Sequence, residues 1–307
     1  MEMSNYSTKG TALRMWAPLL FFWGIRYVID VFFVRTMLFI FYILPGMVGT
    51  APNEMLRGDT LIANTQTMME LVARYRFHSI ALTSIGVLIY GVITFRMDAK
   101  QNVKVDTKGE KQPEQSIASA EKIPLHSYVW IIALALSAGI GLQGLLFLAQ
   151  GALQGGVVGH TLQLLVQGAM NAPLWLQIIG LGMLAPVAEE FLFRGLIFKR
   201  YKERHTFWMA ALFSSVIFGF VHSGSSHFLV SVGVGVTCAY LYEKYDSIVA
   251  PILFHGGMNM LFLAWLHSYR LVELLLNPGT GAALVIGSAF VAALVFTRLQ
   301  RLERKNL

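Results

Sequence analysis

The sequence has very little cysteine and few charged residues. A single cysteine, Cys238, stands among 307 residues, so no disulfide within the chain and no thiolate metal cluster is available. We expect Cys238 to be a small buried helix residue. Charged side chains make up 13% of the chain, against roughly 25% in soluble proteins. With 55% hydrophobic residues and a mean hydropathy of +0.58, this composition indicates an all-α, polytopic transmembrane helical bundle.

We expect no cleavable secretory signal at the start of this sequence. The first apolar run, residues 15–48, is too long for the core of a signal peptide, and no small-residue cleavage pattern follows it. We therefore expect this run to remain as a membrane anchor.

Eight stretches approach the length of about 20 apolar residues that a transmembrane helix needs. The first of them is overlong and contains Arg26, Asp30 and Arg35, for which we expect an ion pair within the helix. The segment after it, residues 50–77, is mixed and polar, and we predict a loop there with a short helix. The eight predicted spans are residues 15–45, 78–96, 127–149, 173–199, 206–223, 227–243, 247–267 and 280–298.

A polar segment over residues 97–124 divides the chain, because its composition cannot bury a core. This predicts an N-terminal transmembrane pair with an outer loop over residues 1–96 and a six-helix membrane domain over 125–298. A basic tail over 299–307 follows. We also expect residues 162–170 to form an amphipathic surface helix. There is no convincing internal repeat.

Lysine and arginine residues predict the orientation of the chain. If the N-terminus is cytoplasmic, 17 of the 24 Lys and Arg residues fall in cytoplasmic segments and four in outer loops. We therefore place both termini and the polar loop in the cytoplasm, and we expect a bacterial plasma membrane. The net charge of +7 is then explained by these loops and by anionic lipid, so no nucleic-acid partner is expected.

The fourth predicted span carries three ionisable side chains, Glu189, Glu190 and Arg194. Each costs roughly 2.5–3.5 kcal/mol to insert at the bilayer centre, and such residues usually mark a functional site. On a helix, Glu190 and Arg194 share a face and can pair, while Glu189 points about 100° away. This leaves Glu189 without an obvious local partner. The alternative interpretation is an ion pair that only fixes helix packing.

Three more polar residues lie in apolar surroundings. His222 follows Phe218 by four residues, and His255 and Asn259 are also four apart, so each pair projects from one helix face. Taken singly, each histidine is better explained as a hydrogen-bonded packing residue. Taken with the glutamates, they form a set suited to hydrolysis, in which a carboxylate activates water, imidazoles position it and an amide stabilises an oxyanion.

These motifs, in this order on successive apolar spans, resemble the CPBP family, which includes type II CAAX prenyl endopeptidases and bacteriocin-processing enzymes. The resemblance covers about residues 173–267 and implies an intramembrane endopeptidase. It implies Glu189 as general base, His222 and His255 as the catalytic histidines, Asn259 as the oxyanion donor, and Glu190 with Arg194 as a supporting pair. The matches are Glu189-Glu190-x-x-x-Arg194, Phe218-x-x-x-His222 and His255-x-x-x-Asn259.

Other interpretations remain open at this stage. Two histidines and a glutamate could bind zinc, but the His-Glu-x-x-His motif is absent, and we expect no cofactor. A proton-coupled transporter or a non-catalytic immunity or regulatory scaffold are the alternatives to a protease. The expected partners are the bilayer and a membrane-associated peptide or protein, while the substrate's identity and the oligomeric state stay open.

One geometric difficulty follows from the predicted spans. His222 would lie about 24 Å along the fifth span from its cytoplasmic start, at 1.5 Å per residue. Glu189 and His255 would lie nearer the cytoplasmic ends of their own spans. For the three to meet, the fifth helix must be tilted or short, or the fourth must extend further into the cytoplasm.

Overall fold

A computed structural model describes residues 8–43, 58–101, 123–152, 172–222 and 228–302 of the chain. Within these residues the chain is almost entirely helical and contains no strand, which confirms the predicted all-α class. The helices are α1 (Thr8–Ile43), α3 (Gly58–Gln101), α4 (Leu125–Ala152), α6 (Leu174–Gln177), η1 (Ile178–Leu184), α7 (Ala185–Glu190), η2 (Phe191–Phe198), α8 (Lys199–Lys202), α9 (Phe207–Val221), α10 (Phe228–Tyr245), α11 (Val249–Leu266), α12 (Tyr269–Leu276) and α13 (Pro278–Leu302).

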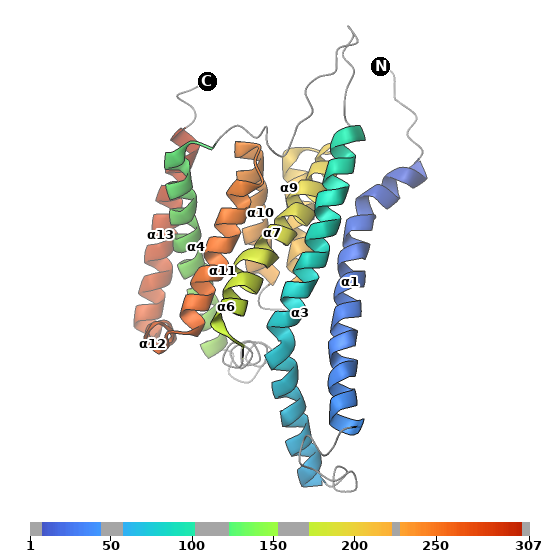
Figure 1. The fold of residues 1–307 in the computed structure, drawn as a ribbon. Helices are drawn as coiled ribbons and strands as arrows, with labels where there is room; N and C mark the ends of the chain where they lie inside the picture. Colours follow the sequence, from blue (N-terminus) through green and yellow to red (C-terminus); the bar gives the residue numbers. More distant parts are fainter. Residues whose placement is uncertain (1–7, 44–57, 102–122, 153–171, 223–227, 303–307) are drawn as a thin grey trace.

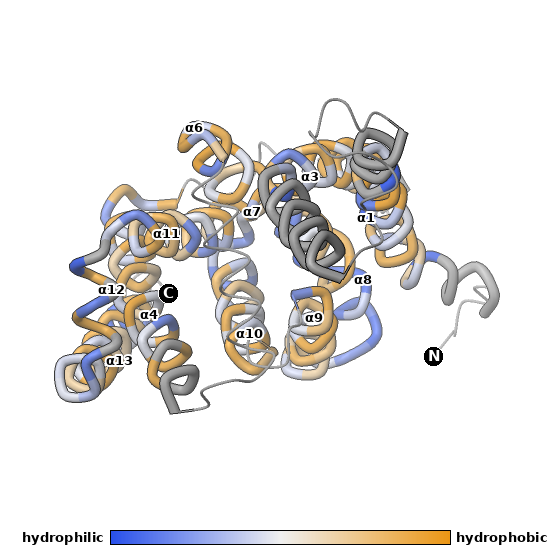
Figure 2. Tube along the Cα trace, turned by 90° about the horizontal axis from the view of Figure 1, so that it is seen from below, coloured by the Kyte–Doolittle hydropathy of each residue, from blue (hydrophilic) through white to orange (hydrophobic). Residues whose placement is uncertain are grey.

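The helices run roughly parallel to one another in an elongated bundle (Figure 1). Seen along the bundle, α13 and α4 lie at one end and α1 at the other, with α7 and α10 between them (Figure 2). Helix α4 packs against α13 and α11, while α9 packs against α10. Large apolar side chains such as Trp23, Ile89 and Phe290 are exposed on the outside, as expected of surfaces that face lipid.

Six helical segments are long and apolar enough to cross a membrane. They lie in α1, α3 and α4, in the continuous helix Leu174–Lys202, and in α11 and α13. Helix α9 is apolar but shorter, and α10 has 18 residues but is less apolar than these six segments. The protein is therefore an integral membrane protein, and every predicted span corresponds to a helix. The count of eight crossings remains a prediction.

The prediction of a loop over residues 50–77 was wrong for its larger part. Helix α3 begins at Gly58 and runs without interruption to Gln101. After Gly58 the segment contains no proline and no glycine up to Gly86, so nothing in it breaks a helix. The loop was predicted because the segment before residue 78 is polar. Low hydropathy indicates that a segment is outside the lipid, but it does not indicate that the segment is not helical. The α1–α3 hairpin consequently extends beyond the rest of the bundle (Figure 1).

The N-terminal pair packs against the rest of the bundle, because α3 lies along η1, α7 and η2. A Cβ atom placed on Gly180 would lie 3.5 Å from the carbonyl oxygen of Phe77, and one on Gly91 would lie 3.3 Å from Phe191. Ion pairs join α1, α3 and α8 at the end of the bundle where the chain enters α1. Asp98 of α3 accepts a hydrogen bond from the Arg200 guanidinium at 2.6 Å.

Three predictions lie wholly or largely outside the described residues. They concern most of the polar loop over 97–124, the surface helix over 162–170 and the end of the basic tail over 299–307. Within the described part, residues 97–101 belong to α3 and α13 continues to Leu302.

Deletion of about residues 101–118 is expected to leave the bundle folded. This segment is polar and has no aromatic residue, so few of its side chains can contribute apolar contacts to the core. The melting temperature of the purified protein in detergent should change by less than about 3 °C, which corresponds to roughly 1 kcal/mol. A larger fall would show that the loop packs against the membrane domain.

Candidate active site

The helix that carries both glutamates is irregular on either side of them. It widens to π-helical geometry over η1 and again over η2, and the short α-helical segment α7 lies between. Pro186 is the second residue of this segment and has no N–H to donate to the preceding turn, which favours a widened turn before it. Such π-helical turns are frequent at functional sites.

The ion pair expected from the spacing is present and completely buried. The Arg194 Nη1 atom donates to Glu190 Oε1 at 2.9 Å, and neither side chain is exposed to solvent. A second guanidinium nitrogen donates to the carbonyl oxygen of Gly235 on α10 at 2.9 Å. The Phe218 ring lies 4.9 Å from the guanidinium carbon, a cation–π distance. This arrangement joins the glutamate helix, α9 and α10.

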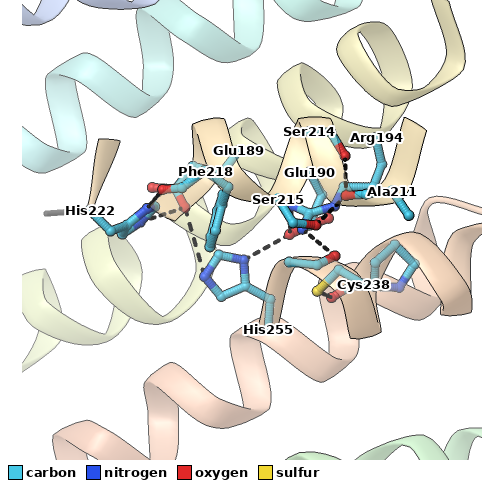
Figure 3. A network of polar contacts seen from close by, with 12 residues as sticks. Glu189, Glu190, Arg194, Ala211, Ser214, Ser215, Phe218, His222, Cys238 and His255 are labelled. Atoms are coloured by element: carbon cyan, nitrogen blue, oxygen red, sulfur yellow. Dashed lines mark hydrogen bonds and ion pairs between the residues drawn. The ribbon is translucent and has the colours of Figure 1, made fainter. Parts of the chain in front are cut away.

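His255 bridges the two glutamates from α11. Its Nδ1 atom lies 2.9 Å from Glu190 Oε1, and its Nε2 atom lies 3.7 Å from Glu189 Oε2 (Figure 3). The glycines around it allow α11 to come this close. A Cβ atom on Gly256 would lie 3.2 Å from the carbonyl oxygen of Gly182, and one on Gly257 would lie 2.9 Å from Ala135. No motif in the sequence pointed to a role for these glycines.

His222, at the end of α9, faces Glu189 on its other side. Its Nε2 atom lies 3.2 Å from Glu189 Oε2, while its Nδ1 atom lies 2.9 Å from the carbonyl oxygen of Phe218. Glu189 therefore has partners on two other helices (Figure 3). The sequence could show only that it lacks a partner on its own helix.

The hydrogen-bond partners restrict where the protons can be. A carbonyl oxygen only accepts, so Nδ1 of His222 must carry a hydrogen. Glu190 is paired with Arg194 and accepts as a carboxylate, so Nδ1 of His255 carries a hydrogen as well. Both Nε2 atoms are thereby left to face the same oxygen of Glu189. If one proton is shared between Glu189 and His222, the charges of this set sum to zero.

Exposure falls steadily across the site. The His222 side chain is 31% exposed, Glu189 is 15% exposed, His255 is 6% exposed, and Glu190 with Arg194 is fully buried. The accessible end is therefore the Glu189–His222 pair, where a substrate can arrive. The buried end holds the two helices and His255 in place. Cys238 lies at this buried end, fully enclosed as expected.

Asn259 lies one turn beyond His255 on α11 and has a structural bond of its own. Its Nδ2 atom donates to the carbonyl oxygen of Leu181 at 2.9 Å. In a π-helical turn that carbonyl would pair with the N–H five residues later, but this residue is Pro186, which has none. The asparagine thus supplies the donor that proline removes. One hydrogen of its amide group remains for another acceptor.

Substitution of Asn259 by alanine is expected to destabilise the protein as well as impair it. The half-buried carbonyl of Leu181 would lose its donor, and a buried acceptor left without one typically costs about 1–3 kcal/mol. Pro186→Ala restores a backbone donor, so the same Asn259→Ala change should cost less stability in that background. Thermal unfolding of the four proteins of this double-mutant cycle in detergent measures the coupling. An Asn259→Ala variant that melts like the intact protein would contradict this bond.

The depth difficulty in the predicted spans is resolved for Glu189 and His222 by helix length, while His255 lies about 9 Å from the start of α11. The glutamate helix continues through α8 to Lys202, so Glu189 lies up to about 20 Å from that end. Helix α9 has 15 residues, which brings His222 to about 22 Å from its start. Five of the six predicted site residues are joined by direct contacts, and Asn259 contacts the same helix through Leu181.

Comparison with known proteins identifies the region that contains this site. Residues 171–261 match the family model described as type II CAAX prenyl endopeptidase Rce1-like. Over this region the chain is similar to proteases of the CPBP family. It is 36% identical over 116 residues to the "Putative membrane peptidase YdiL" of Bacillus subtilis, a match that covers 38% of this chain and 47% of the relative.

Two further relatives are also bacterial. The UPF0177 protein YajF of Lactococcus lactis is 32% identical over 89 residues, or 28% of this chain and 43% of the relative. The UPF0177 protein YxdF of the same organism is 30% identical over 89 residues, or 29% and 49%. The chain thus spans about half the length of the curated relatives it matches. No solved structure matches it.

The donor set does not fit a metal ion as its members lie. Across residues 8–43, 58–101, 123–152, 172–222 and 228–302, no three His, Cys, Asp or Glu side chains are arranged to hold one. Glu189 Oε2 lies against both imidazoles instead of sharing a common centre with them. Because these residues do not form a ligand set, no step below is derived through a metal.

Proposed function

We propose that this protein is an intramembrane endopeptidase, which hydrolyses a peptide bond of a membrane-associated peptide or protein with a water activated by Glu189. The observation that supports the proposal most directly is the convergence of two imidazole Nε2 atoms on one carboxylate oxygen, at 3.2 and 3.7 Å. Both Nδ1 atoms are occupied by acceptors, so the rings are fixed in orientation.

In this mechanism water binds beside Glu189 at the accessible end of the site. Glu189 takes a proton from the water, and the oxygen attacks the carbonyl carbon of the substrate. The remaining hydrogen of the Asn259 amide bonds to the oxyanion that develops. The C–N bond then breaks, and the proton held between Glu189 and His222 passes to the leaving amine.

Glu190, Arg194 and His255 hold this machinery in position. The buried Glu190 accepts from His255 Nδ1 at 2.9 Å, as a carboxylate does when it orients a catalytic imidazole. Arg194 keeps Glu190 charged, and its bond to Gly235 fixes α10 against the same helix. The bacterial relatives favour a peptide or membrane protein of a bacterial plasma membrane as the substrate. The distribution of lysine and arginine favours an enzyme with both termini in the cytoplasm.

The proposal is tested by comparing peptides released from membranes that contain one of three proteins. These are the intact protein, a Glu189→Gln variant and a Glu273→Gln variant as a control for the charge change. Glu273 lies exposed on α12, away from the site. Mass spectrometry should find peptides that depend on Glu189 and persist in the control. Identical release from all three membranes would reject a peptidase and favour a regulatory scaffold.

A further inference from the structure

A second group of charged side chains lies beside the site, on helices outside the CPBP match. Arg26 on α1 donates from Nη1 to the carbonyl oxygen of Val221 at 3.5 Å, next to His222 in the sequence. Its Nε atom lies 3.7 Å from Asp30 Oδ2, as expected for an ion pair within the helix. Ser79 on α3 donates to the other oxygen of Asp30 at 2.6 Å. The group therefore spans α1, α3 and the end of α9 at His222.

The group carries more positive than negative charge. Arg76, one turn from Ser79 on α3, lies within electrostatic range of both Arg26 and Asp30. Its Nε atom is buried and has no hydrogen-bond partner among the residues that the structure describes. Asp30 can compensate one of the two guanidinium groups. If Glu189 and His222 share a proton, the catalytic set is neutral, and among the described residues no carboxylate other than Asp30 contacts Arg26 or Arg76.

A purely structural role explains only part of this group. It accounts for the Arg26–Asp30 pair, but the side chains of these residues are 46% and 50% exposed within a predicted membrane span. Charges exposed to lipid are costly, and ionisable residues at this depth usually face a cavity or a partner. An uncompensated guanidinium beside a half-open charge pair is suited to an anionic ligand.

We propose that Arg76, with Arg26 beside it, forms a subsite that binds a carboxylate of the peptide substrate. The inference rests on the proposed endopeptidase function and adds a determinant of specificity to it. Two sources supply this chemistry in a peptide, an acidic side chain or the C-terminal carboxylate. Because Arg26 bonds to the residue before His222, a carboxylate held here would place the neighbouring backbone near Glu189.

The subsite is tested by binding, which needs no catalysis. A fluorescent apolar ten-residue peptide is made in four forms, with Glu or Gln at one internal position and with a free or amidated C-terminus. Fluorescence anisotropy measures its affinity for the purified full-length Glu189→Gln protein in detergent. A form with a carboxylate should bind about 10- to 100-fold tighter than the form with none, as charge-assisted hydrogen bonds contribute. If the Glu form binds more tightly, the subsite takes an acidic side chain. If the form with a free C-terminus binds more tightly, it takes the C-terminal carboxylate.

Substitution of the arginines tests whether Arg76 and Arg26 bind the carboxylate of the peptide. Arg76→Gln in the same protein should remove the preference and leave the affinity for the uncharged form unchanged, while Arg76→Lys keeps part of it. Arg96→Gln is the matched control, because Arg96 is exposed on the same helix. If Arg76→Gln does not fold, the exposed Arg26→Gln variant provides the comparison and should weaken the preference.

Several results would contradict the proposed carboxylate subsite. They are equal binding of the four forms, no binding of any form, or a preference that survives in Arg76→Gln. A uniform loss of affinity for all forms also contradicts it, because this would show a structural role. Failure of the endopeptidase proposal is seen separately, as membranes that release the same peptides with and without Glu189.

Discussion

Glu189→Gln is expected to slow peptide hydrolysis by about 10²–10⁴-fold, the usual contribution of a general base, and to leave the protein folded. Glutamine keeps the shape of the side chain but cannot take a proton from water. Its amide can still lie between His222 and His255, which contact this position at 3.2 and 3.7 Å. Rates measured on a purified peptide substrate, with melting temperatures in detergent, separate loss of chemistry from loss of structure.

The effects of Glu189 and His222 should not add. If the two groups share one proton and act as a unit, the double variant Glu189→Gln/His222→Gln will be no slower than the worse single variant. Independent roles would instead multiply the two losses. Glu273→Gln, exposed on α12, should retain the full rate and serves as the control.

Treatment of the purified protein with a strong chelator is expected to leave its rate unchanged. The proposed mechanism uses only side chains of the chain, in which Glu189 contacts the imidazoles directly. Elemental analysis should find no stoichiometric zinc. Activity that disappears with the chelator and returns with zinc would make Glu189, His222 and His255 metal ligands, essential for a different reason.

Much of this site could be predicted from the sequence because several of its contacts are made between residues close together on the same helix. The i, i+4 spacing of Glu190 and Arg194 defines one helix face, and the ion pair at 2.9 Å follows from it. Charged residues in apolar runs stand out for the same reason, because the bilayer makes them costly. The pattern of residues along the chain is therefore enough to indicate which side chains form the site.

The contacts between different helices could not be predicted from the sequence. No periodicity indicates that both histidines face one oxygen of Glu189, because this depends on how three helices pack. The glycines at 182, 256 and 257 control that packing, but a glycine in an apolar run has no distinctive pattern. The bond between Asn259 and Leu181 depends on a π-helical turn ahead of Pro186, which the sequence alone does not reveal.

Arg194→Ala is expected to reduce the stability and the yield of folded protein as well as the activity. The change leaves Glu190 buried without its cation and removes the donor to the Gly235 carbonyl. Breaking a buried pair from one side typically costs about 3–5 kcal/mol. Arg96→Ala, an exposed arginine on α3, is the control and should melt like the intact protein.

A double variant shows whether the cost comes from the stranded carboxylate. In Glu190→Gln/Arg194→Met neither charge remains, and replacing both members of a buried pair is often far less harmful than removing one. This variant should therefore recover part of the melting temperature lost in Arg194→Ala. It should stay inactive, because His255 no longer has a carboxylate to orient it. If Arg194→Ala melts like the intact protein and loses only activity, then Arg194 acts in the chemistry and the structural role argued for the pair is wrong.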